Sequence, residues 1–127
     1  MDSRELLSYC LNKPGAIEDY PFGPEVTVLK VFNKMFALFY RREGRIFISL
    51  KCEPYLATLL RQRYSDVTPG YHLNKRHWNT VLPDGDIPED EIRGMIDHSY
   101  ECVVKTLPRK ARQTLIPAVG SVGINNG

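Results

Sequence analysis

One stretch of the chain, residues 67–81, concentrates the side chains that could bind or react with a ligand. It holds two of the three histidines and the only tryptophan of the 127-residue chain, and it contains no carboxylate. Cationic side chains contact phosphates, whereas amide and aromatic groups contact nucleobases. The stretch therefore predicts a positively charged binding surface formed by His72, Asn74, Lys75, Arg76, His77 and Trp78.

Three further basic residues precede this stretch and extend its positive field. Lys51 ends a predicted strand, and Arg61 and Arg63 lie on the polar side of a predicted helix. A protein that contacts two to four phosphates in this way binds weakly and with little sequence preference. We therefore expect weak, largely nonspecific binding of DNA.

The role of Trp78 has two interpretations that the sequence leaves open. The indole ring can serve as a stacking platform for a base. It can equally anchor the hydrophobic core together with Tyr71, because large aromatic side chains are mostly buried in folded proteins. Under the second interpretation Lys75 and Arg76 are the exposed residues of the stretch.

Other chemistries have less support in the spacing of the residues. A metal site would require His72 and His77 to converge with a third ligand such as His98, Asp97 or Glu18. A separation of five residues places two side chains on opposite faces of a strand, so we expect no metal.

The motifs of common enzymes are also missing from the sequence. It contains no GxSxG, no HExxH and no phosphate-binding loop. A histidine paired with Glu18 or Asp19 stays possible as an arrangement made by the fold. We nevertheless expect no enzymatic activity and no cofactor. The alternative to nucleic-acid binding is a small-molecule or anion-binding module that uses the loop HLNKRHWNT.

Three segments together resemble the MmcQ/YjbR family of small bacterial proteins. They are PGYHLNKRHWNTV at 69–81, EDYPFG at 18–23 and VLKVFNKMFAL at 28–38. The resemblance covers roughly residues 1–110. It implies an α/β fold related to the frataxin-like (CyaY-like) fold and similar to the double-wing domain of a phage transcription factor. It also implies the DNA-binding role with which that family is labelled.

Length and composition predict one modest domain. The chain is 43% hydrophobic with a net charge of +2, which is ordinary for a soluble protein and leaves any binding face to local clustering. No apolar run approaches the ~20 residues of a membrane span, and the amino terminus is polar, so we expect a cytoplasmic protein that does not contact membranes. We also expect a monomer, because the sequence shows no heptad seam and no exposed apolar helix face. Three widely spaced cysteines are expected to be small buried hydrophobes.

The expected fold is α+β, with an antiparallel sheet packed on one face by the amino- and carboxy-terminal helices. Helical spacing follows the acidic cap Asp2 and ends at Lys13–Pro14, and residues 16–24 look like a connection. We expect residues 1–112 to form the domain and residues 113–127 to form a flexible tail. Strands are predicted at 26–32, 35–41, 45–51 and 77–82, and further helices from Pro54 to Arg63 and from Pro88 to Leu107.

Overall fold

The computed structural model describes residues 2–115 as an α+β domain. Its helices are α1 (Ser3–Leu11), α2 (Pro54–Arg63) and α3 (Glu89–Val104), and a further helical segment spans residues 109–115. Its strands are β1 (Ala16–Asp19), β2 (Val26–Val31), β3 (Lys34–Arg42), β4 (Arg45–Lys51), β5 (Val67–Pro69) and β6 (Trp78–Val81).

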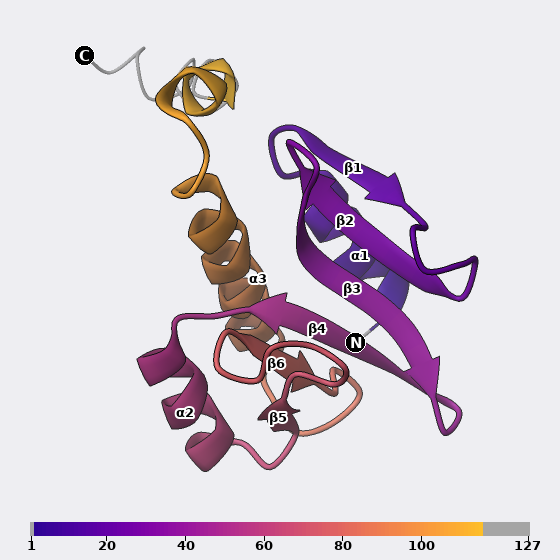
Figure 1. Ribbon diagram of the computed structural model, residues 1–127. Helices are drawn as coiled ribbons and strands as arrows, with labels where there is room; N and C mark the ends of the chain where they lie inside the picture. Colours follow the sequence, from indigo (N-terminus) through magenta and orange to yellow (C-terminus); the bar gives the residue numbers. More distant parts are fainter. Residues whose placement is uncertain (1, 116–127) are drawn as a thin grey trace.

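The strands form one sheet in the order β1-β2-β3-β4-β6-β5, and each neighbouring pair is antiparallel. Helices α1 and α3 pack on the same face of this sheet, behind it in Figure 1. The main core lies between them and contains Leu6 of α1, Leu29 of β2 and Ile96 of α3, each fully buried. The predicted fold class is therefore confirmed.

The predicted helices start where their capping residues stand. The carboxylate of Asp2 accepts a hydrogen bond of 2.9 Å from the amide of Arg4, which satisfies one of the free amides of the first turn of α1. Helix α2 begins with Pro54 at its first position, and three acidic residues occupy the first turn of α3.

Helix α3 ends three residues before the predicted end. The amides of Thr106 and Leu107 bond to carbonyls three residues back, and the Thr106 hydroxyl donates to the carbonyl of Val103 at 2.7 Å. These tighter bonds close the helix at Val104, and the chain turns before Pro108. Of the predicted flexible tail, residues 113–115 belong to the helical segment and Leu115 is buried, while the remainder lies outside the described residues.

A β-bulge in β3 sets the direction of the end of β4. Leu29 pairs with Ala37 and Lys30 with Met35, so Phe36 is the extra residue and points to the helices together with Ala37. The buried hydroxyl of Ser99 in α3 donates to the carbonyl of Phe36.

The same hydroxyl accepts a 2.8 Å hydrogen bond from the amide of Lys51. Beyond its pair with Ala37, β4 therefore leaves β3 and continues along β6, where Lys51 faces Trp78.

Two strands of the sheet were not predicted. Residues 16–19, expected to be a connection, form β1, and residues 67–69 form β5. Both are edge strands, and β1 exposes Ile17 and Glu18 in succession, so the alternation typical of a half-buried strand is absent. Edge strands of three or four residues take their conformation from the neighbour they pair with.

The four strands that were predicted match the structure within one residue at each end. Within residues 2–115 no helix is long and apolar enough to cross a membrane.

Candidate functional site

The indole ring of Trp78 packs into a small apolar cluster on the outer face of the sheet, which is the face opposite α1 and α3. Its residues are Val28, Leu38 and Trp78, and the tryptophan is 8% exposed. Leu38 points away from the main core because its neighbours Ala37 and Phe39 point into it. The structure thus shows Trp78 as a packing residue, whereas Tyr71 is 40% exposed.

Arg61 of α2 holds residues 70–77, here called the motif loop, against β6. Its Nε donates to Oδ1 of Asn79 at 2.7 Å, and its Nη2 donates to the carbonyl of Trp78 at 3.2 Å and to that of Lys75. Asn79 is 2% exposed, so the first bond is largely shielded from water. The guanidinium of Arg61 is therefore engaged with the protein itself.

Lys75 is engaged in a similar way inside the motif loop. Its Nζ donates to the carbonyl of Gly70 at 3.0 Å. Gly70 itself lies so close to β6 that a Cβ there would stand 2.6 Å from the Cβ of Trp78. The bond from Lys75 thus closes the loop at Gly70. Any larger residue at this position would displace Trp78.

Asn74 fixes the far side of the motif loop. Its Oδ1 accepts hydrogen bonds from the amides of Arg76 at 2.9 Å and His77 at 3.2 Å, which is an Asx-type turn. The orientation leaves Nδ2 as the free hydrogen-bonding group of this side chain. The carbonyl of His77 accepts the amide of Cys52 at 2.8 Å, which ties the loop to the end of β4.

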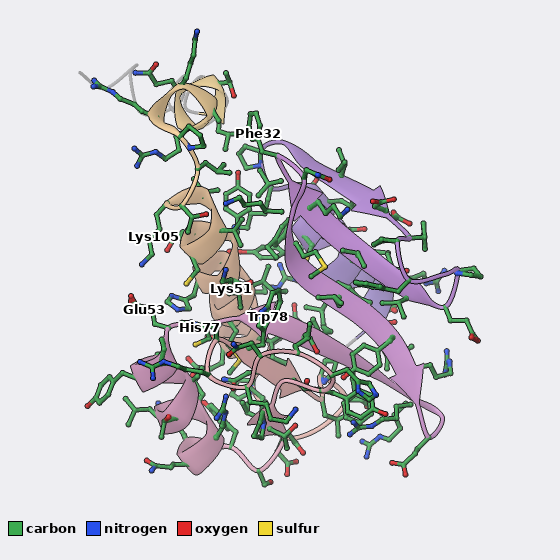
Figure 2. The ribbon with its side chains drawn as sticks, viewed as in Figure 1. Phe32, Lys51, Glu53, His77, Trp78 and Lys105 are labelled. Atoms are coloured by element: carbon green, nitrogen blue, oxygen red, sulfur yellow. The ribbon has the colours of Figure 1, made fainter. Side chains whose placement is uncertain are left out.

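A cleft of about 510 Å³ opens between the motif loop, the end of β4 and the carboxy-terminal end of α3. We call it the Lys51 cleft. Figure 2 shows five of its side chains, from Lys105 at the end of α3 to Glu53 at the start of α2. It is lined by Lys51, Cys52, Glu53, Pro54, Asn74, His77, Trp78, Cys102, Lys105 and Thr106.

The charges in the Lys51 cleft are mainly positive. Lys105 pairs with Glu53 at 3.2 Å, and this carboxylate raises the pKa of the Lys105 ammonium. Both side chains are more than half exposed, so water screens the pair. For Lys51, no carboxylate lies within 4 Å in the described part of the chain.

The other predicted binding residues lie outside the Lys51 cleft. The guanidinium of Arg63 lies 5.3 Å from the ring centre of Tyr64, and Arg76 is exposed. The ring of His72 lies 4.0 Å from that of Tyr71, and its backbone has the left-handed φ of 58°. The structure thus brings Lys51, Asn74, His77 and Trp78 to one cleft and places Arg61, Arg63, His72, Lys75 and Arg76 outside its lining.

The thiols of the cleft are neutral at physiological pH. Burial raises the pKa of Cys52 to about 11 and also raises that of Cys102. The sulfur of Cys102 lies 3.3 Å from Nε2 of His98, which also accepts the amide of Glu53 at 3.2 Å. A protonated thiol is a poor nucleophile and a poor metal ligand. Among residues 2–115 no group of three or more His, Cys, Asp or Glu could hold a metal ion.

Sequence analysis missed Lys105, Thr106 and Glu53 as cleft residues. Lys105 stands 54 positions after Lys51 in the chain and directly follows α3. The apolar periodicity of α3 predicts which residues of that helix are buried, but not what surrounds the residue after its end. No local signal connects the two lysines, and only the docking of α3 brings them to one cleft.

The model of the YjbR family matches residues 11–102. The chain belongs to the YjbR family. The resemblance seen in the sequence is thereby confirmed. The uncharacterised protein YjbR of Escherichia coli K12 is 44% identical over 116 residues, which are 91% of this chain and 98% of that protein. YbdF of E. coli O157:H7, another uncharacterised protein, is 39% identical over 98 residues, or 77% of this chain and 80% of that one.

Solved structures have the same fold as this YjbR-family chain. Protein DR2400 of Deinococcus radiodurans, with the family domain DUF419, is 35% identical with a TM-score of 0.81, over 89% of this chain and 86% of that chain. A Pseudomonas syringae protein is 28% identical with a TM-score of 0.70, over 80% of this chain and 98% of that chain. Both structures therefore share the overall fold of this chain.

Proposed function

We propose that this protein binds a small ligand through a carboxylate or phosphate group in the Lys51 cleft. The observation that carries the proposal is Lys51 itself, a half-buried side chain in the cleft with no carboxylate within 4 Å among residues 2–115. A lysine without a carboxylate partner offers its charge and its three N–H donors to an anionic ligand.

Other donors around Lys51 support the same ligand class. Lys105 adds a second ammonium, the amide nitrogen of Asn74 is free, and the His77 ring lines the same wall. A volume of about 510 Å³ lies within the usual range for small-molecule sites. The motif loop is fixed by Arg61 and Lys75, so Asn74 and His77 are in place before a ligand arrives.

The cleft supports binding better than thiol chemistry. Both cysteines in its lining hold their protons at neutral pH, because burial disfavours the thiolate. All three cysteines are free and buried, as free thiols are in a reducing compartment. We therefore propose a cytosolic binding protein without catalytic activity.

The test uses inorganic phosphate and citrate as probes in calorimetric titrations. Lys51→Met keeps the aliphatic part of the side chain and removes the charge, and it should weaken binding by about 10-fold, the lower end of what a charge-assisted hydrogen bond contributes. Lys110→Met is the matched control, since Lys110 is exposed on the helical segment 109–115, outside the cleft. Equal affinities of the Lys51→Met variant and the parent protein would refute the proposal.

Nucleic-acid binding is a second candidate, supported by two exposed cations outside the cleft lining. Arg63 and Arg76 have no carboxylate within 4 Å in the described part of the chain. The double variant Arg63→Ala/Arg76→Ala should then flatten the slope of log affinity against log salt by about two units, measured by fluorescence anisotropy with single- and double-stranded 20-mers.

The salt dependence separates the two candidates. Contact with two to four phosphates gives a slope of about −2 to −4, whereas a single anionic group gives about −1. A parent protein that binds neither oligonucleotide at low salt excludes the second candidate and leaves the first intact.

A further inference from the structure

A second hollow, of about 180 Å³, lies between α2 and α3 on the face of the sheet that carries the main core. We call it the α2–α3 groove. Its floor is formed by Leu50 of β4 and Val81 of β6, which also belong to the main core. Leu56 and Leu60 of α2 form one wall, and residues of α3 form the other. The surface of the groove is therefore mainly apolar.

The wall on α3 is a row of residues on one face of that helix. Glu91, Gly94 and His98 stand three and four positions apart, so they follow one another along the helix axis. Oε1 of Glu91 accepts the hydroxyl of Tyr64 at 2.8 Å. Nε2 of His98 accepts the amide of Glu53 at 3.2 Å. Glu53 and Tyr64 flank the two ends of α2, so the two helices are bonded to each other at both ends of the groove.

Gly94 keeps the middle of the α2–α3 groove open. A Cβ built there would meet no atom within 4 Å, so the space in front of this glycine is unfilled. Glycine weakens the interior of a helix relative to alanine. Gly94 has neither a left-handed φ nor a close neighbour, so backbone conformation and packing do not require glycine here. Room for a ligand gives this residue a role.

The α2–α3 groove adjoins the Lys51 cleft. Lys51 and Cys52, at the end of β4, line both hollows. The polar side chains Glu91, His98 and Asn79 of the groove all hold hydrogen bonds within the protein. Lys51 differs from them, because no carboxylate lies within 4 Å of it among residues 2–115. A ligand in the groove thus meets apolar walls and an unpaired lysine at the border with the cleft.

We propose that the α2–α3 groove holds the apolar part of the ligand whose anionic group binds Lys51. The ligand is then a small amphipathic anion, in which an aromatic ring or a branched alkyl group is joined to a carboxylate or phosphate. This inference rests on the anion site proposed above and names the class of molecule that the site takes. An apolar protein cavity of about 150 Å³ admits benzene, so about 180 Å³ is sufficient for one such ring.

The test compares phenylacetate with acetate, which has the same anionic group without the ring. In amide-detected NMR titrations of the full chain, phenylacetate should bind about 10-fold more tightly than acetate, the lower end of what burial of a phenyl ring contributes. Lys51→Met should weaken both probes by about 10-fold, as for phosphate.

Variants at Gly94 test the position of the ring. Gly94→Leu places a side chain in the groove and should remove the advantage of phenylacetate while leaving acetate unchanged. Gly94→Ala is the matched control, since a single methyl group leaves most of the volume free, and it should reduce the advantage less than Gly94→Leu does. Alanine and leucine both favour a helix over glycine, so both variants should fold.

Three outcomes would overturn the inference. They are equal affinities of the parent protein for phenylacetate and acetate, an advantage of the ring that survives in Gly94→Leu, and a phenylacetate affinity that Lys51→Met leaves unchanged. Phosphate titrations of the parent protein and of Lys51→Met judge the anion site separately. If Lys51→Met weakens phosphate but the ring gives no advantage, this inference fails and the anion site stands. If phosphate binding does not depend on Lys51, the anion site fails and the inference fails with it.

Discussion

Replacing Arg61 with methionine should destabilise the protein although Arg61 touches no carboxylate. The change removes three hydrogen bonds that hold the motif loop to β6 and to α2. It leaves Oδ1 of Asn79 buried without its donor, which costs about 1–3 kcal/mol. The two bonds to carbonyls lie nearer to water and contribute roughly 0.5 kcal/mol each. We expect a total loss of about 3 kcal/mol, which is a fall in Tm of roughly 10 °C for a domain of this size.

Urea unfolding followed by tryptophan fluorescence measures this loss directly. Trp78 is the only tryptophan and is buried beside the motif loop, so its emission reports the region that Arg61 holds. Arg63→Met is the matched control, since it removes the same charge two residues away on α2 and should cost under about 0.5 kcal/mol. Arg61→Lys should recover little, because an ammonium cannot reach three acceptors in the geometry of a guanidinium. Equal losses of stability in Arg61→Met and Arg63→Met would show that Arg61 does not hold the motif loop in place.

Three further outcomes are expected. Gly70→Ala should lower stability by roughly 1–3 kcal/mol in thermal melts, because its Cβ would meet Trp78 at 2.6 Å, whereas Gly94→Ala in α3, with nothing within 4 Å, should raise stability by up to about 1 kcal/mol. Burial raises the pKa of Cys52 to about 11 and that of Cys10 to about 12, so the folded state holds these protons more tightly than the unfolded chain. The free energy of unfolding should therefore fall as pH rises from about 9 through about 12, and the fall should be smaller in a Cys10→Ala/Cys52→Ala variant, measured by urea midpoints. Sedimentation equilibrium at micromolar concentration should show a monomer, and a stable dimer would contradict this.

The sequence predicts most of the fold because its main elements carry strong local patterns. The acidic cap Asp2, the proline at the start of α2 and the apolar periodicity of α3 each specify a helix without help from distant residues. The strands from Val26 to Lys51 follow from β-branched and aromatic composition in the same way. Strands β1 and β5 lack such patterns, since pairing with a neighbour determines their conformation.

The candidate site is less accessible to prediction, because the role of a cation depends on its partners. Arg61 and Lys75 have the residue types of a phosphate-binding surface. Their acceptors, however, are the side chain of Asn79 and three backbone carbonyls, and the sequence alone does not reveal these partners. Trp78 has two plausible roles in the sequence, and its burial follows from Val28 and Leu38, which lie 40 to 50 positions earlier. Lys51 is the cation that sequence and structure both place at the site.

The bond between Ser99 and the end of β4 has a consequence for the order in which the protein assembles during synthesis. The amide of Lys51 finds its partner in a residue made 48 positions later, on a helix that must already be docked on the sheet. Strands β2 to β4 can pair with one another before α3 is made, and the end of β4 can pair with β6, but the amide of Lys51 lacks its partner until residue 99 has emerged. The floor of the Lys51 cleft is therefore among the last parts of the domain to form, and the cleft is complete only when α3 has docked.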